Sequence, residues 1–341
     1  MKKYEINLNG NKLSIETGKI ARQSDGSVMV THGETTVLVA VNAAKEARED
    51  IDFFPLQVEY RERHYAGGKI PGGFFKREAR PSEHEIFTSR LTDRPIRPLF
   101  PKSFKNETLV IITVMSSDGE NMADTLAGVG ASAALMVSDI PFSGPIATVR
   151  VGRINDEFVI NPTRSQMEDS DMEIIVSGND QTIVMVEGEA ELITEEVFLD
   201  AMKFAHEPIK QLIDLQNQLA ADLSVEKREI SEEETNEELE KAVSDLVSSK
   251  IDKAIKIADK GDREDAISLL KEEAIQSFEE SHPESEQLVS NFVNAQLKNA
   301  FREQILSESK RSDGRKTTDI RPITIETGIL PRTHGLSLIH I

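Results

Sequence analysis

Aromatic rings and positive charge occur together in the segment 72–80. Phe74 and Phe75 are adjacent, and each offers a flat face on which a nucleic-acid base can stack, at about 1–3 kcal/mol per base. The same segment carries cations that could neutralise phosphates, namely Lys76, Arg77 and Arg80. The glycine-rich stretch 66–73 favours a loop, which has no strand of its own to bury both rings. We therefore expect this loop to bind a single-stranded polyanion; the alternative is that both rings belong to the core.

A second set of arginines follows in the next helix-like segment. Arg90, Arg94 and Arg97 recur every three or four residues, so they could line one face and extend the basic surface of the loop. The alternative is that Asp93 pairs with Arg94 or Arg97 and clamps the proline-rich turn that follows. The spacing fits both interpretations equally.

Other polar residues fit metal binding or catalysis poorly. His64 and His84 lie 20 positions apart with no third ligand at suggestive spacing, and the chain has no cysteine, so we expect no metal site. Asp118, Asn121 and Asp124 stand at the start of a helix-like run, where capping is the more common role. No carboxylate pair suited to acid–base chemistry is evident, so we assign no catalytic residue.

The charge of the chain is unevenly distributed. The formal net charge is −20, which taken whole argues against a nucleic-acid-binding protein. Residues 61–105, however, contain eleven Lys and Arg against five Asp and Glu. A basic segment on an acidic protein is typical of one face that handles a polyanion, although a solvated basic loop would show the same balance.

The composition also bounds the compartment. No apolar run approaches the ~20 residues of a membrane-spanning helix, and the first residues lack the apolar stretch of a signal peptide. The absence of cysteine suits a reducing environment. We expect a cytoplasmic protein with no membrane partner.

The elements that must position these residues alternate between strands and helices. Period-two patterns predict strands at 12–16, 28–31 and 36–41, the last two joined by a turn at His32 and Gly33. A helix opens at Ser82, and a buried strand follows at 109–114. A small-residue helix at 121–138, strands at 146–151, 172–176 and 182–186, and a helix at 194–219 complete an α/β domain over 1–220.

The second half of the chain has a different composition. The stretch 231–240 is too acidic and too poor in apolar residues for a core, which predicts a linker over 221–236. Apolar residues at helical spacing then predict an all-α domain of about three helices over 237–307, divided by Pro283.

A short repeat links the two ends of the chain. The sequence of residues 15–18 recurs at 325–328, and Arg22 recurs as Arg332, each at an offset of 310. We infer that a second copy of the N-terminal domain starts within 308–335 and is truncated. Its first strand should then lack its hairpin partner, and residues 336–341 are either a truncated second strand or a non-native tail.

Taken together, these motifs resemble bacterial polynucleotide phosphorylases. The similar residues span 1–335 and are concentrated at 15–18, 52–56, 72–83, 93–101, 130–135, 313–315 and 330–335. Lys76 and Ala79 stand where that family often has Arg and Gly. After Gly335 the family usually continues Ser-Ala-Leu-Phe, and the departure from Leu336 onward favours the non-native tail.

The resemblance implies a fold of class α/β (α+β), with a ribonuclease-PH-like core of β-α-β type, a small all-α domain and the start of a second core. In that family three chains form a ring around an RNA channel, and KH and S1-type domains follow the second core. The reaction is processive 3′-to-5′ phosphorolysis of single-stranded RNA, in which inorganic phosphate releases nucleoside diphosphates and carboxylate-held Mg²⁺ neutralises charge. An RNA-degradation complex is a further partner of the family.

Catalytic residues of the family belong mainly to the second core, so the resemblance implies that this chain alone is an inactive fragment that binds RNA and forms the ring. No residue here is assigned to Mg²⁺ or phosphate. Two alternatives remain. One is a stand-alone RNA-binding or assembly module of ribonuclease-PH fold; the other is a self-sufficient phosphorolytic enzyme, which would need a carboxylate pair in the first core.

Overall fold

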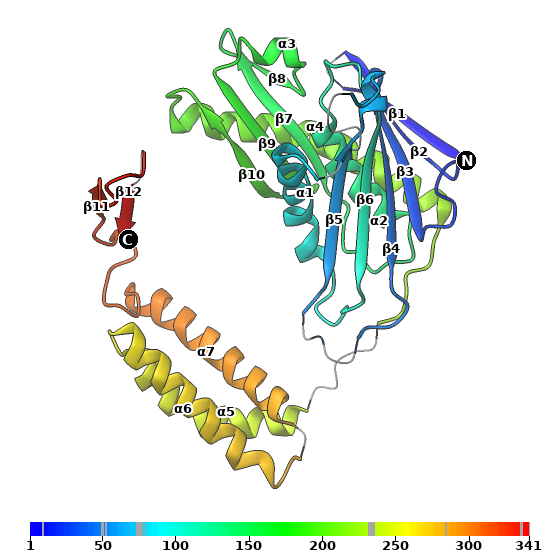
Figure 1. The fold of residues 1–341 in the computed structure, drawn as a ribbon. Helices are drawn as coiled ribbons and strands as arrows, with labels where there is room; N and C mark the ends of the chain where they lie inside the picture. The colour runs from blue at the N-terminus through cyan, green and yellow to red at the C-terminus, as the bar shows by residue number, and fades with distance from the viewer. Residues whose placement is uncertain are drawn as a thin grey trace. The chain divides into compact units, whose positions relative to one another are not determined.

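The computed structural model describes residues 1–8, 10–48, 51, 53–72, 78, 80–230, 236–283, 285–334 and 337–340. The chain divides into two compact units, Met1–Glu233 and Glu234–Ile341. Figure 1 shows that the first unit combines sheets and helices, whereas the second is mainly helical. Phe74, Phe75, Lys76 and Arg77 lie outside the described residues.

The first sheet of the N-terminal unit has the strand order β1-β2-β3-β4-β6-β5. Its strands are β1 (Lys2–Leu8), β2 (Asn11–Thr17), β3 (Gly26–His32), β4 (Thr35–Ala43), β5 (Leu56–Glu62) and β6 (Thr108–Ser116). Neighbouring strands are antiparallel except β5 and β6, which are parallel. The strands predicted at 12–16, 28–31, 36–41 and 109–114 are confirmed. Burial alternates along most of β4, which explains why its period-two pattern was readable.

The turn between β3 and β4 is fixed by a neighbouring loop. Gly33 has a φ of +60°, and a Cβ at this position would lie 2.4 Å from the side-chain nitrogen of Asn121. Asp118 accepts hydrogen bonds from the backbone N–H of Glu34 at 3.1 Å and of Asn121 at 2.7 Å. These polar side chains therefore tie the turn to the loop after β6.

The capping role expected for Asp118, Asn121 and Asp124 is wrong. Helix α2 (Ala123–Met136) has Met122 at its N-cap position and no side-chain cap there. Asp118 and Asn121 are instead used by the turn, and Asp124 lies inside the first helical turn. The reason is tertiary: each side chain finds a partner outside the helix.

The small residues of α2 permit close packing on both sides. A Cβ on Gly130 would lie 2.6 Å from Val39 Cγ2, and one on Gly128 would lie 2.4 Å from Thr148 Oγ1. Gly130 thus leaves room for β4, and Gly128 leaves room for the side chain of Thr148. Both glycines lie inside a helix, whereas those of a phosphate-binding turn would follow a strand.

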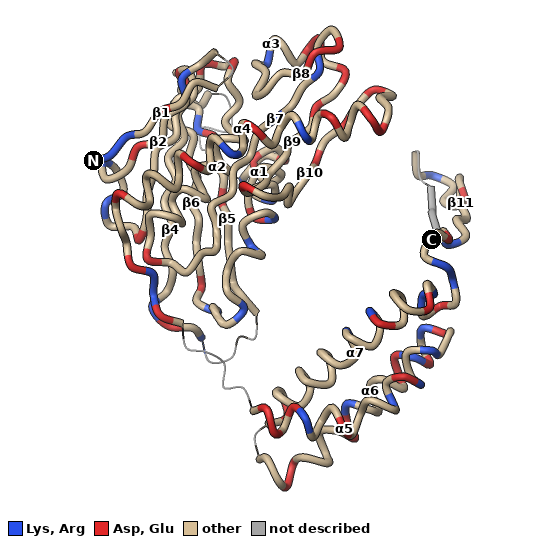
Figure 2. Tube along the Cα trace, turned by 180° about the vertical axis from the view of Figure 1, so that it is seen from behind, with Lys and Arg blue, Asp and Glu red and all other residues tan. Residues whose placement is uncertain are grey.

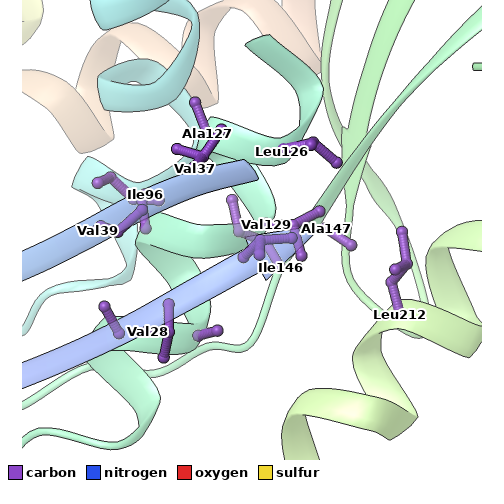
Figure 3. Packing of buried hydrophobic residues seen from close by; sticks show 14 of the residues in the cluster. Val28, Val37, Val39, Ile96, Leu126, Ala127, Val129, Ile146, Ala147 and Leu212 are labelled. Carbon is purple, nitrogen blue, oxygen red and sulfur yellow. The ribbon is translucent and has the colours of Figure 1, made fainter. Parts of the chain in front are cut away.

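The second sheet has the order β10-β9-β7-β8. Its strands are β7 (Ala147–Ile154), β8 (Glu157–Ile160), β9 (Met172–Gly178) and β10 (Ile183–Ala190), and the short helix α3 (Arg164–Met167) follows β8. Helix α4 (Glu195–Leu223) packs on this sheet and on β1. One apolar cluster extends from Val39 of β4 through Leu126 of α2 to Leu212 of α4, so both sheets share a core (Figure 3).

Helix α1 (Glu83–Ile96) begins at the predicted residue. Ser82 Oγ accepts a hydrogen bond from the Glu85 N–H at 3.2 Å, and Glu85 Oε2 accepts one from the Ser82 N–H at 2.6 Å, which is a capping box. The helix packs against β5, and its buried Leu91 clusters with Ile175 and Met185, which belong to the second sheet. The 3-10 turn η2 (Arg97–Leu99) follows the helix.

The segment after α4 is held on the N-terminal unit. The ammonium group of Lys227 donates hydrogen bonds to the carbonyl oxygens of Leu135 at 2.8 Å and Ser138 at 2.7 Å, at the C-terminal end of α2. Arg228 pairs with Asp25 and Asp139, both at 2.9 Å. Of the segment predicted as a linker, 221–236, residues 221–223 are therefore the end of α4. Residues 224–230 are attached to the N-terminal unit through Lys227 and Arg228.

The described part of the second unit contains three helices: α5 (Glu237–Ala254), α6 (Lys260–Glu279) and α7 (Glu286–Glu308). They share an apolar core that includes Val243, Ala274 and Val293. The predicted three-helix arrangement is confirmed, with Pro283 between α6 and α7.

The expected orphan strand near the C-terminus is wrong. Strand β11 (Thr324–Thr327) pairs antiparallel with β12 (Ser337–His340). In the first copy Ile15 pairs with Val30, whereas Ile325 pairs with Ile339, which corresponds to position 29 at the offset of 310. The pairing therefore differs by one residue from that of the N-terminal hairpin, so the repeat in sequence is not continued in the strand register.

Candidate functional site

A cleft of about 800 Å³ opens beside α1 in the N-terminal unit. Its walls come from the 3-10 turn η1 (His64–Gly67), the first turns of α1 and α2, and strands β7, β9 and β10. A concave site where residues from distant parts of the chain converge is the default candidate for binding. Three hydrogen-bonded sets include charged residues that line it.

The first set is a buried ion pair. Arg150 of β7 contacts Asp124 of α2 through two nitrogens, at 2.5 and 3.2 Å, and their side chains are only 5% and 4% exposed. Glu173 Oε1 lies 2.8 Å from Arg150 Nε. Burial acts to raise the pKa of Asp124, but the charge and hydrogen bonds of Arg150 outweigh it and the net direction is downward. Arg150 is thus already neutralised and is not available to an incoming anion.

The second set joins α1 to β5. Tyr60 Oη donates to Glu62 Oε1 at 2.8 Å, and His84 Nε2 lies 3.3 Å from the same oxygen. The hydrogen bond to Glu62 raises the pKa of His84, and the pKa of Glu62 is correspondingly lowered. The imidazole at the cleft therefore carries more positive charge near neutral pH than an isolated histidine.

The third set is centred on Glu78, the residue that follows 73–77. Glu78 accepts hydrogen bonds from the His64 N–H at 2.7 Å, from His64 Nδ1 at 2.8 Å and from Arg63 at 2.9 Å. The His64 hydrogen bonds, followed by that of Arg63, lower the pKa of Glu78 to about 2. Glu78 is therefore held by two residues that line the cleft, Arg63 and His64.

The arginines predicted from spacing have different surroundings. Arg97 pairs with Asp93, at 2.6 and 2.9 Å, and donates to the Leu56 carbonyl at 3.0 Å, which is the clamp that the spacing allowed. Arg94 pairs with Glu187 of β10 at 2.7 Å. Arg80 and Arg90 are exposed. Binding by these four residues stays a prediction, as it does for Phe74, Phe75, Lys76 and Arg77.

Sequence reasoning missed the buried pair and the His84 set. A signal for the pair was present, because Arg150 is a charged residue inside an apolar strand and needs a buried partner. Its partner could not be named, because Asp124 is 26 positions away on another element. Among the described residues no three His, Asp or Glu side chains are arranged to hold a metal ion.

Both units are acidic overall: residues 1–233 contain 39 Asp and Glu against 25 Lys and Arg, and residues 234–341 contain 21 against 15. Residues 237–308 contain seventeen Asp and Glu against nine Lys and Arg, and the acidic residues lie along α5 and α6 and at the two ends of α7 (Figure 2). The eleven basic residues of 61–105 lie in the first unit. The positive charge of the first unit is thus concentrated in one segment.

Comparison with known proteins matches the two units to different family domains. Residues 10–141 and 144–207 match domains 1 and 2 of the 3′ exoribonuclease family, and residues 238–316 match the polyribonucleotide nucleotidyltransferase RNA binding domain. The polyribonucleotide nucleotidyltransferase of Geotalea uraniireducens is 46% identical over 336 residues, which cover 98% of this chain and 48% of that protein. Those of Desulfatibacillum aliphaticivorans and Bacillus cytotoxicus are each 48% identical, over 98% of this chain and 47% of theirs. This chain belongs to the polyribonucleotide nucleotidyltransferase family.

Within the family, the match is to the N-terminal portion, and the chain spans about half the length of the curated relatives that it matches. A solved structure, an Archaeoglobus fulgidus exosome with RNA bound to the active site, has a TM-score of 0.48 and 18% identity, over 59% of this chain and 87% of that one. The family match stands without it. No helix in the described part of the chain is long and apolar enough to cross a membrane.

Proposed function

We propose that this chain is the first core and helical domain of an enzyme that degrades mRNA by processive 3′-to-5′ phosphorolysis of single-stranded RNA to nucleoside diphosphates. The observation that carries the proposal is the order of the three matches along the chain, together with 46–48% identity over 98% of its length. A cytoplasmic location and membership of an RNA-degradation complex are part of the proposal.

The part played by this chain is to bind RNA and to form a homotrimeric ring. The chemical step, with its Mg²⁺ and inorganic phosphate, is assigned to the second core of the longer relatives. One feature of the first core supports this division: Asp124 and Arg150 of its cleft are paired with each other, so neither is free to bind a metal ion or a phosphate. No catalytic step is assigned to a residue of this chain.

The alternatives predict different results in one assay. The purified chain and a full-length relative are incubated with oligo(A) and inorganic phosphate, and ADP release is measured. We expect release by the relative and none by this chain, because no group assigned here stabilises the charge that develops in the transition state. Robust ADP release by this chain would establish a self-sufficient enzyme instead. A full-length relative reconstituted without its first core that still assembles and binds RNA normally would favour a stand-alone module.

The segment 72–80 is tested by the salt dependence of RNA binding. Replacing Phe74 and Phe75 with Ala should weaken binding by roughly 2–5 kcal/mol with little change in salt dependence, because stacking releases no counterions. Replacing Arg77 and Arg80 with Ala should lower the slope of log K against log salt by about 1.4, at ~0.7 for each phosphate contact. Fluorescence anisotropy at three salt concentrations measures both.

Thermal melting of the same variants is the control. If the two phenylalanines are core residues, their replacement should lower the melting temperature by several degrees and leave the RNA affinity of the folded molecules intact. That result would move them from the binding surface to the core.

A further inference from the structure

Phe87 is an aromatic residue that the fold leaves at the edge of the cleft. Its side chain is 47% exposed, although it lies on α1 between the buried residues Glu85 and Thr88. Phe87 also lines the cleft of about 800 Å³. The ring is thus partly in contact with water beside a concave site, where a flat ligand that covered it would bury apolar surface.

A positive charge lies one helical turn further along. Arg90 stands three residues after Phe87, so the two side chains share a face of α1. Arg90 is exposed, and no ion pair or hydrogen bond of its side chain is seen within the described residues. The next arginine on this helix, Arg94, is by contrast paired with Glu187. Phe87 and Arg90 therefore present a ring and a guanidinium to the same solvent region.

The interior of the cleft suits a base better than a phosphate. Its lining contains six Asp and Glu against four Lys and Arg, and its most buried arginine, Arg150, is already paired. Asp124 and Glu173 are occupied by Arg150, and Glu62 by His84. Glu189 of β10 also lines the cleft, is exposed, and shows no ion pair within the described residues. Its carboxylate repels a phosphate but can accept hydrogen bonds from the exocyclic amino groups that adenine, cytosine and guanine carry.

We propose that Phe87 is a base-stacking residue for single-stranded RNA. One base stacks on the ring at the mouth of the cleft with its amino group turned towards the acidic lining, and the adjoining phosphate is bound by Arg90 outside. This inference rests on the proposed function for the presence of RNA, and it adds to it a binding residue and a preference for amino-bearing bases over uracil.

A protein partner is the competing occupant. Ile86 is 49% exposed next to Phe87, and two adjacent apolar residues also suit a protein interface. The exposed Arg90 and the hydrogen-bond acceptors of the cleft favour RNA. The similar exposure of the two neighbours makes Ile86 a matched control, because an isoleucine has no face on which a base can stack.

The experiment uses the absence of tryptophan in this chain. Phe87→Trp introduces a single indole fluorophore at the proposed site and keeps an aromatic face. We expect oligo(A) and oligo(C) to quench its emission and oligo(U) to quench it less. Phe87→Ala should weaken oligo(A) binding about 5- to 150-fold, the range that corresponds to one stacked base, with an unchanged salt slope. Ile86→Ala should bind within about twofold of the unaltered chain, a change well below the loss of one stacked base.

The outcomes separate this inference from the proposed function. If oligo(A) binds by anisotropy while the indole emission of the Phe87→Trp variant is unchanged and Phe87→Ala binds normally, RNA binding stands and the role of Phe87 is refuted. If the unaltered chain binds no RNA, both fail. If Ile86→Ala and Phe87→Ala both lower the sedimenting mass and neither weakens RNA binding, the surface is a protein interface and the inference is overturned.

Discussion

Replacing Asp124 with Asn tests whether the buried pair in the cleft stabilises the packing of α2 on β7. The change keeps the size of the side chain and removes its charge. Arg150 then remains 5% exposed, with only Glu173, whose side chain is 37% exposed, to compensate it. The variant therefore isolates the electrostatic part of the contact between α2 and β7.

The expected effect is large. Removing one partner of a buried ion pair typically costs about 3–5 kcal/mol, because it leaves an uncompensated charge in a poorly polarisable interior. Since Glu173 Oε1 is 2.8 Å from Arg150 Nε, part of the compensation persists. We expect Asp124→Asn to lower the free energy of unfolding of the N-terminal unit by about 3 kcal/mol, the low end of that range.

Tyrosine fluorescence during urea unfolding measures this directly. The chain has no tryptophan, and its three tyrosines, Tyr4, Tyr60 and Tyr65, all lie in the N-terminal unit. The signal therefore reports that unit and not the helical one. Urea midpoints and slopes are compared between the unaltered chain and the variant.

Two further variants make the result decisive. Glu207→Gln removes the exposed pair with Lys210 and should leave the urea midpoint unchanged. Replacing Asp124 with Leu and Arg150 with Met together removes both charges and should recover most of the loss. A free energy of unfolding for Asp124→Asn within about 1 kcal/mol of the unaltered chain would refute the reasoning, because a loss that small is typical of an ordinary hydrogen bond.

Three other substitutions test contacts that organise the N-terminal unit. Lys227→Met removes the donor to the last carbonyls of α2, and an unsatisfied buried group costs about 1–3 kcal/mol. The melting temperature should therefore fall, and amide exchange in 224–230 should become faster. Unchanged exchange would contradict the role of Lys227 in holding this segment. Gly130→Ala places a methyl group against Val39 and should cost about 1–3 kcal/mol in a urea titration, whereas a stabilised variant would show that the strand can move away. Partial burial acts to raise the pKa of Asp118, but hydrogen bonds from Asn121 and three backbone N–H groups hold it at about 2, below the ~3.9 of an unfolded chain. Its stabilisation is therefore complete above pH ~4 and lost towards pH 2, and the difference in melting temperature between the unaltered chain and Asp118→Asn should narrow over that interval; a constant difference would contradict this.

The elements of the fold were largely readable from the sequence because they depend on local patterns. Alternating apolar residues predicted β3 and β4, and the small residues of α2 predicted close packing that Gly128 and Gly130 indeed make. Ser82, three residues before Glu85, forms the capping box that starts α1. Each of these signals involves residues within one or two turns of each other, so the chain needs no distant partner to express them.

The partners of the charged side chains were decided only by the tertiary structure. From spacing alone, Asp93 could pair with either Arg94 or Arg97. Because β10 packs beside α1, Arg94 pairs with Glu187, 93 positions away, and Asp93 pairs with Arg97. Asp124 looked like a helix cap until β7 placed Arg150 against it. The acidic stretch after α4 looked like free linker from residue 221, but Lys227 and Arg228 find acceptors on α2 and β4. The sequence shows which residues carry charge. Which of several oppositely charged residues becomes the partner depends on which one the folded backbone brings within about 3 Å, and spacing along the sequence does not determine that distance.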